Sequence, residues 1–163
     1  MHFDLLQYAD ASPYTHWTDT DIIASGEMHT RFENQIRLMF NIFDDFRNFT
    51  QVVRYSVNME SWTLIEMKNL AKNAPNSDFE FSNINPLYYN KPYKYAYMSR
   101  NVFTLNGAVV KLNVDDGSMI TKELPDGLFP TEPIFVSHPN PVSEDDGVIL
   151  MSGVDGGKEK VGI

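Results

Sequence analysis

The sequence contains no cysteine, which excludes disulfides, thiolate metal ligands and cysteine nucleophiles and is consistent with a reducing compartment. No run approaches about 18 apolar residues, so no membrane-spanning helix is predicted. The first residues lack the basic and apolar stretches of a signal peptide. A formal net charge of −9 would repel a phosphate backbone, so nucleic acid is not an expected partner. We therefore expect a cytoplasmic protein.

Sequence motifs for several common chemistries are also missing. There is no nucleophile elbow, phosphate loop or dinucleotide fingerprint. None of the four histidines shows metal-ligand spacing: His2, His16, His29 and His138. The acidic stretches at 115–117, 144–147 and 154–157 resemble Asp-Gly hairpin turns, and none matches a calcium-binding loop. We interpret them as turns.

The residues that are present favour a folded, mainly β chain. Hydrophobic residues make up 42% and aromatics 13%, enough for a core, and 163 residues fit one domain. After a loop at 8–26, residues about 27–47 carry an apolar stripe at helical spacing: Phe32, Ile36, Met39, Phe40, Phe43 and Phe46. This pattern predicts one amphipathic helix.

Most of the remaining chain has the alternation of β-strands. Expected strands cover residues 1–7, 51–57, 62–68, 94–100, 109–114, 119–124, 133–138 and 147–153. Two hairpins, at about 51–68 and 108–124, resemble each other, with Val52, Val53 and Arg54 matching Val109, Val110 and Lys111. Repeated antiparallel units of this kind are typical of propeller blades, although a meander within one sandwich is the alternative. With strands for two to three blades, residues 1–163 are expected to form a single incomplete propeller domain.

Two glutamates stand out among apolar neighbours. Glu80 lies between Phe79 and Phe81, and Glu132 lies between Pro130 and Pro133. Because strand residues alternate in direction, Glu80 either points to water while the rings enter the core, or faces inward when the Phe side meets a neighbouring blade. A buried carboxylate needs a donor, and a histidine N–H can supply one.

Residues 79–150 resemble the carotenoid cleavage oxygenase family, in particular its animal branch of β-carotene oxygenases and the visual-cycle retinoid isomerase. The resemblance rests on FEFSNIN (79–85), KPYKYAY (91–97), VVKLNV (109–114) and PTEPIFVSHPNPVSEDDGVIL (130–150). Residues 27–57 fit the family more loosely, as a helix followed by a strand.

The resemblance implies a seven-bladed β-propeller, with the predicted helix belonging to a cap over one face. It implies an Fe(II) held on the axis by four histidines, with three glutamates accepting hydrogen bonds from outer ring nitrogens. Glu80 and Glu132 match two of these glutamates, whereas His138 matches a histidine that is not a ligand. By this resemblance, the chain supplies no iron ligand. The implied reaction splits a double bond of a carotenoid or retinoid polyene with O₂ into two carbonyl products.

Other interpretations stay open at this stage. The chain is expected to be a fragment that is inactive alone and does not hold iron tightly. It could instead be a non-catalytic β-rich fragment or interaction module, or belong to a retinoid isomerohydrolase in which the metal serves ester cleavage with isomerisation. The family's lipid-phase substrates leave peripheral membrane association open, although no basic amphipathic helix is visible.

Overall fold

The computed structural model describes residues 1–7, 50–74, 78–102, 107–155 and 160–162, and its regular structure there is mainly β. The expected β class is confirmed, whereas the helix expected at about 27–47 lies outside the described residues. Within the described ranges, no helix has the length and apolar character needed to cross a bilayer. The elements are β1 (His2–Gln7), β2 (Gln51–Asn58), β3 (Thr63–Asn69), β4 (Phe79–Ile84), the 3₁₀ helix η1 (Pro86–Tyr88), β5 (Tyr95–Arg100), β6 (Ala108–Asn113), β7 (Met119–Glu123), β8 (Leu128–Pro130), β9 (Ile134–Ser137), β10 (Gly147–Leu150), β11 (Gly153–Asp155) and β12 (Lys160–Gly162).

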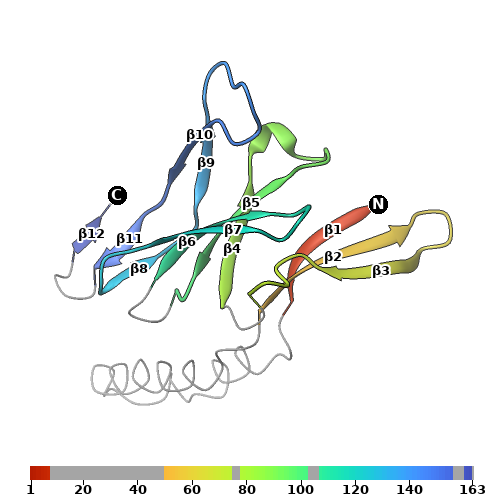
Figure 1. Cartoon of the computed structure of the whole chain (residues 1–163), viewed down its shortest axis with the longest axis horizontal. Coiled ribbons are helices and arrows are strands. Elements are labelled where there is room, and N and C mark those ends of the chain that lie inside the picture. Colours follow the sequence, from red (N-terminus) through yellow and green to blue (C-terminus); the bar gives the residue numbers. More distant parts are fainter. Residues whose placement is uncertain (8–49, 75–77, 103–106, 156–159, 163) are drawn as a thin grey trace, which may run out of the picture.

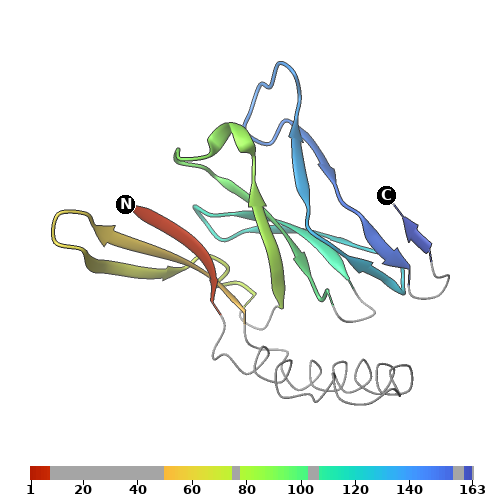
Figure 2. The same cartoon turned by 180° about the vertical axis from the view of Figure 1, so that it is seen from behind.

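The strands form antiparallel sheets that lie side by side (Figures 1 and 2). A four-stranded sheet, β4-β5-β6-β7, stands between the three-stranded sheet β1-β2-β3 and the strands β8 to β12. In the central sheet each strand pairs with the next one along the chain. Four consecutive antiparallel strands are the unit from which a propeller blade is built.

The central sheet follows directly from residue alternation and turn chemistry. Residues of β6 alternate between buried and half-buried, as expected for a strand with two different faces. Between β6 and β7, the Asn113 side chain accepts the N–H of Asp115, and the Asp116 side chain accepts the N–H of Ser118. Gly117 has a φ of 76°, a conformation that suits glycine. The acidic stretch at 115–117 is therefore a turn.

The hairpin β2–β3 occupies the same place in its sheet as β6–β7 does in the central sheet. In both sheets these are the last two strands, preceded by β1 and β5 respectively. Val52 packs from β2 into the core between β1-β2-β3 and the central sheet. Val110 packs into the same core from β6 of the central sheet. The sequence similarity between the two hairpins thus reflects equivalent positions in neighbouring sheets.

The main hydrophobic core lies between β1-β2-β3 and the central sheet. It contains Val52, Leu70, Ala71, Phe79, Ala96, Met98, Val110, Leu112 and Val114. Phe79 begins β4, which lies at one edge of the central sheet, and it is only 1% exposed. Burial of an aromatic side chain of this size contributes roughly 1.5–3 kcal/mol. The face of β4 that carries Phe79 is therefore fixed by the core.

Candidate functional site

Glu132 lies at a break in an otherwise continuous strand. β8 ends at Pro130, and β9 begins at Ile134, which leaves three residues between them. Pro130 and Pro133 have no N–H to donate to a neighbouring strand, so a regular ladder cannot run through this point. Both prolines are buried, whereas the Glu132 side chain is exposed. The break leaves Glu132 outside the ladder.

The facing strand is broken at the same level. The residue alternation predicts one continuous strand over 147–153, but the structure divides it into β10 and β11, with Met151 and Ser152 between them. Thr131 closes the gap: its N–H donates to the Ser152 carbonyl over 3.2 Å, and its hydroxyl donates to the same oxygen over 2.8 Å. The break is therefore an ordered part of the sheet.

Glu80 lies on the face of β4 opposite the core. Alternation places it on the other side from Phe79, and its register partner on β5 is Ser99. Ser99 is fully buried, and its hydroxyl donates to the carbonyl of Thr131, the residue before Glu132. The structure thus brings Glu80 and the Glu132 segment to one contact region, between β4–β5 and the β8–β9 strand.

The two glutamates differ in their surroundings. Glu80 is half-buried and makes interactions within the protein. The Glu132 carboxylate has no hydrogen-bond or ion-pair partner among the residues that the structure describes. Its oxygens can therefore accept hydrogen bonds from a group supplied outside those residues.

His138 lies immediately after β9, where it bonds to backbone. Its N–H donates to the carbonyl of Asp146 over 2.9 Å, and its ring Nδ1 accepts the N–H of Asn140 over 3.2 Å. The side chain is exposed. These bonds hold the turn that leads into the acidic loop. In the described ranges, no group of three or more His, Cys, Asp or Glu side chains is placed to hold a metal ion.

Glu144 in the acidic loop clamps the central sheet. Its carboxylate accepts the N–H of Lys94 over 2.8 and 2.9 Å and the N–H of Tyr95 over 2.8 Å. Its carbonyl accepts a bond from the side chain of Asn85, which is 1% exposed, over 2.7 Å. The loop between β9 and β10 is therefore tied to the start of β5.

Asp145 and Asp146 are engaged in the same loop. Asp145 forms an ion pair with Lys111 of β6, and this ammonium holds the pKa of the Asp145 carboxyl below its ordinary value. Asp146 accepts the N–H of Val142 over 2.9 Å. Because protein groups already bind these carboxylates, the stretch at 144–147 acts as a turn and a clamp.

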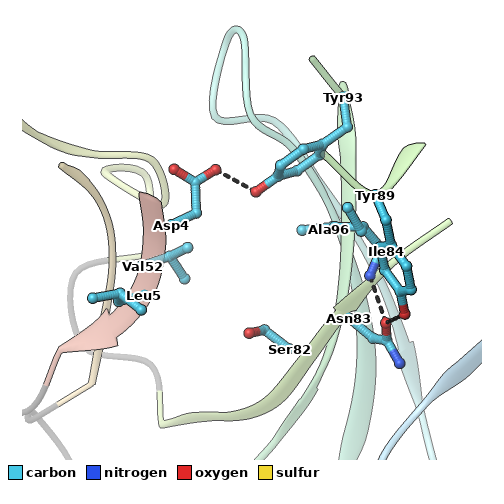
Figure 3. A pocket seen from close by; sticks show the side chains of 9 residues that line it. All are labelled: Asp4, Leu5, Val52, Ser82, Asn83, Ile84, Tyr89, Tyr93 and Ala96. Carbon is cyan, nitrogen blue, oxygen red and sulfur yellow. Dashed lines mark hydrogen bonds between the residues drawn. The ribbon is translucent and has the colours of Figure 1, made fainter. Parts of the chain in front are cut away.

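A second polar cluster joins β1-β2-β3 to the central sheet. Arg54 donates to both carboxylate oxygens of Asp4, over 2.8 and 2.6 Å, and the Tyr93 hydroxyl donates to the same carboxylate. Burial and the hydrogen bond to Asp4 raise the pKa of Tyr93. Figure 3 shows the Asp4 carboxylate pointing at the Tyr93 hydroxyl, and both residues line a pocket of about 250 Å³ together with Ser82 and Ile84 of β4.

Sequence patterns did not indicate Ser99, Thr131 or the Asp4–Arg54–Tyr93 cluster. Asp4 and Arg54 are far apart in the chain, and their pairing depends on the register of β1 with β2. Ser99 is one small polar residue in an apolar strand, and its importance depends on the register with Glu80. Only knowledge of strand pairing could have identified them.

Comparison with known proteins is consistent with this geometry. The family model described as retinal pigment epithelial membrane protein matches residues 1–162. The torulene dioxygenase of Fusarium fujikuroi is 39% identical over 83 residues, which are 50% of this chain and 14% of that protein. The carotenoid isomerooxygenase of Drosophila melanogaster is 46% identical over 72 residues, 43% of this chain and 12% of that protein. The matches thus span a small part of these relatives.

Solved structures show the same fold. A single-residue variant of the Synechocystis apocarotenoid oxygenase is similar over 98% of this chain and 29% of its own, with a TM-score of 0.66 and 22% identity. The cobalt-substituted Synechocystis enzyme is similar over 71% of this chain and 24% of its own, with a TM-score of 0.60 and 25% identity. The similarity to the apocarotenoid oxygenase variant confirms the expectation of a partial β-propeller. Because the family model covers nearly every residue, the chain belongs to the retinal pigment epithelial membrane protein family, the carotenoid oxygenase family that its motifs resemble.

Proposed function

We propose that the chain is part of a non-haem iron oxygenase that splits one double bond of a carotenoid or apocarotenoid. One O₂ adds across the cleaved C=C bond, with one oxygen atom entering each of two carbonyl products, so the reaction balances without another reductant. The names of the relatives, torulene dioxygenase and carotenoid isomerooxygenase, support this reaction class. The retinoid isomerohydrolase alternative has no better support.

The described residues do not themselves fit an iron ligand set, because they contain no suitable cluster of His, Cys, Asp or Glu. They fit a different role. A ligand imidazole binds metal through one ring nitrogen and donates from the other, and a carboxylate acceptor fixes its tautomer and orientation. We assign this acceptor role to Glu80 and Glu132, toward histidines outside the described residues.

One observation carries the proposal: Glu132 is exposed at an ordered strand break, with no partner among the described residues. A glutamate that only faces solvent does not require an ordered backbone on both sides. The buried prolines on both sides and the bonds from Thr131 hold the backbone that carries this carboxylate. An acceptor carried on an ordered backbone suits a group whose role is to orient a ring.

Replacing Glu132 by Gln in the complete protein should lower metal affinity or turnover about 10–100-fold, because an amide is a weaker acceptor and lacks the charge. Glu80→Gln should act in the same direction. Iron content by elemental analysis and turnover of a carotenoid substrate would be measured together with the melting temperature, which should change little for Glu132→Gln.

Glu123→Gln is the matched control. Glu123 is an exposed glutamate on β7 whose carboxylate is already paired with Arg100. It should leave iron content and turnover unchanged. Normal iron content and normal turnover in both Glu132→Gln and Glu80→Gln would refute the assigned role.

A non-catalytic role is the second candidate. The matched part of the chain covers only 12–14% of the curated relatives described above, and the described residues contain no metal-ligand cluster. In that case the chain by itself would be a β-rich module with at most an interaction role. Membrane association and cytoplasmic location remain proposals that depend on the complete protein.

A further inference from the structure

Ser99 is a polar residue at an unusually buried position. It lies in β5 beside Ala96, Tyr97 and Met98, all of which are buried, and it is itself 0% exposed. Burying a hydroxyl costs free energy unless a hydrogen bond replaces its water. The Ser99 hydroxyl makes that bond to the carbonyl of Thr131, and the sulfur of Met151 lies 3.9 Å away. A buried serine is therefore matched to one specific backbone oxygen.

The Thr131 carbonyl oxygen lies in the segment between β8 and β9, where backbone N–H donors are few. Pro130 and Pro133 remove two backbone N–H groups from the segment that carries Glu132. Thr131 bonds to Ser152 on the facing strand, within the same sheet. Ser99 instead belongs to the central sheet, so its bond ties the break to a neighbouring sheet.

Ser99 also lies directly opposite Glu80, the other glutamate of the proposed site. Glu80 and Ser99 are directly opposed in the β4–β5 pair, so their side chains leave the sheet on the same face. On one side, Ser99 neighbours Glu80 across the strands. On the other, it holds the residue before Glu132.

We propose that Ser99 is a positioning residue that sets the place of Glu132 relative to Glu80. This inference rests on the proposed function, because the two carboxylates must point at ring N–H groups held on one metal. Carboxylate partners of ligand histidines typically change metal affinity or activity 10–100-fold when removed. A carboxylate that is displaced but still present would lose only part of its contribution to metal affinity or activity. Ser99→Ala should therefore act in the same direction as Glu132→Gln, by about 10-fold or less.

The test uses the complete protein stripped of metal and refilled with Co(II), since a solved relative was obtained in cobalt-substituted form. Co(II) affinity by competition with a chelator, and the visible absorption of the bound ion, report on the site without turnover. Ser99→Ala should weaken Co(II) binding and shift the absorption. Ser99→Thr, which keeps the hydroxyl, should restore both toward wild type. In the metal-free protein, the amides of Thr131 and Glu132 should exchange faster in Ser99→Ala.

Ser56→Ala is the matched control, because Ser56 is also a buried strand serine, but its hydroxyl lies 2.9 Å from His2 Nδ1 within the β1-β2-β3 sheet. It should leave Co(II) binding unchanged. The double variant Ser99→Ala with Glu132→Gln separates positioning from general destabilisation. If Ser99 acts through Glu132, its effect disappears once Glu132 is changed, so the two effects are not additive.

The outcomes are distinct. If Glu80→Gln and Glu132→Gln both leave Co(II) binding unchanged, the proposed function fails, whatever Ser99 does. If they weaken binding while Ser99→Ala does not, the inference about Ser99 alone is wrong. Additive effects in the double variant, or no restoration by Ser99→Thr with wild-type melting temperature, would also overturn it. Loss, restoration and non-additivity together would establish it.

Discussion

At the scale of single residues, local sequence indicates some functional positions and conceals others. Glu132 stands out in the sequence because two prolines bracket it within an apolar run. Ser99 does not stand out, because a single serine in a strand is usually a surface residue. Its burial and its bond to Thr131 follow from how two sheets meet.

Tyr97 shows the same dependence on tertiary structure. Its ring stacks on Phe135 with centroids 5.0 Å apart, and its hydroxyl is buried with no partner among the described residues. Burial, with negative charge from Asp145 and Glu144, raises the pKa of Tyr97. Replacing Tyr97 by Phe keeps the stacking and removes the unpaired hydroxyl. The free energy of unfolding should stay equal or rise by up to about 1 kcal/mol, measured by urea denaturation.

Tyr55→Phe provides the contrast for that measurement. The Tyr55 hydroxyl donates to the side chain of Gln7 over 2.9 Å, so its removal leaves an acceptor unpaired. It should lower the free energy of unfolding by about 0.5–1.5 kcal/mol. A loss as large in Tyr97→Phe would mean that the Tyr97 hydroxyl has a partner.

At the scale of elements, the strands of the two similar hairpins were predictable, whereas β4, β8, β12 and the break between β10 and β11 were not among the expected elements. Alternation of residues placed the strands of the β2–β3 and β6–β7 hairpins within a residue or two. It joined 147–153 into one strand, because Met151 and Ser152 fit an extended pattern as well as their neighbours do. The break between β10 and β11 lies opposite Pro130 and Pro133 of the facing strand. Residues 147–153 contain no proline themselves, so their own sequence does not indicate it.

The contact between β6 and the acidic loop has a defined pH dependence. Lys111 lowers the pKa of Asp145 in the folded protein, so this pair stabilises the fold above the unfolded-state pKa of about 3.9. That contribution is lost as pH falls through the lower folded-state value. Lys111→Met should cost no more than about 1 kcal/mol at pH 7, and the difference from wild type should shrink by about pH 3.

Part of the loss should persist in acid, because the Lys111 ammonium also lies 4.0 Å from the centre of the Tyr95 ring. Urea unfolding at several pH values would measure the trend. Lys122→Met on the neighbouring β7 is the control, and its effect should not vary with Asp145 ionisation. A Lys111→Met difference that is equal at pH 7 and pH 3 would contradict the assignment.

At the scale of the whole molecule, the sheets are arranged like consecutive propeller blades. The described part contains no cluster that could hold a metal by itself. Because the family resemblance assigns no iron-ligating histidine to this chain, we predict that the purified 163-residue chain binds iron well below one equivalent and does not cleave a carotenoid. Elemental analysis after dialysis and a substrate-loss assay would measure this. One tightly held iron per chain would show that the missing ligands lie within residues that the structure does not describe.

The sequence by itself determined the β class, the two similar hairpins and the acidic turns at 115–117 and 144–147, and it singled out Glu80 and Glu132 as candidates. These depend on alternation, turn chemistry and short motifs, which act over a few residues. Only the tertiary structure decided that Ser99 stands opposite Glu80, that its hydroxyl holds the Thr131 carbonyl, and that Asp4 meets Arg54 and Tyr93. Register and sheet contact bring these residues together from distant parts of the chain, and both are set by burial of side chains such as Phe79.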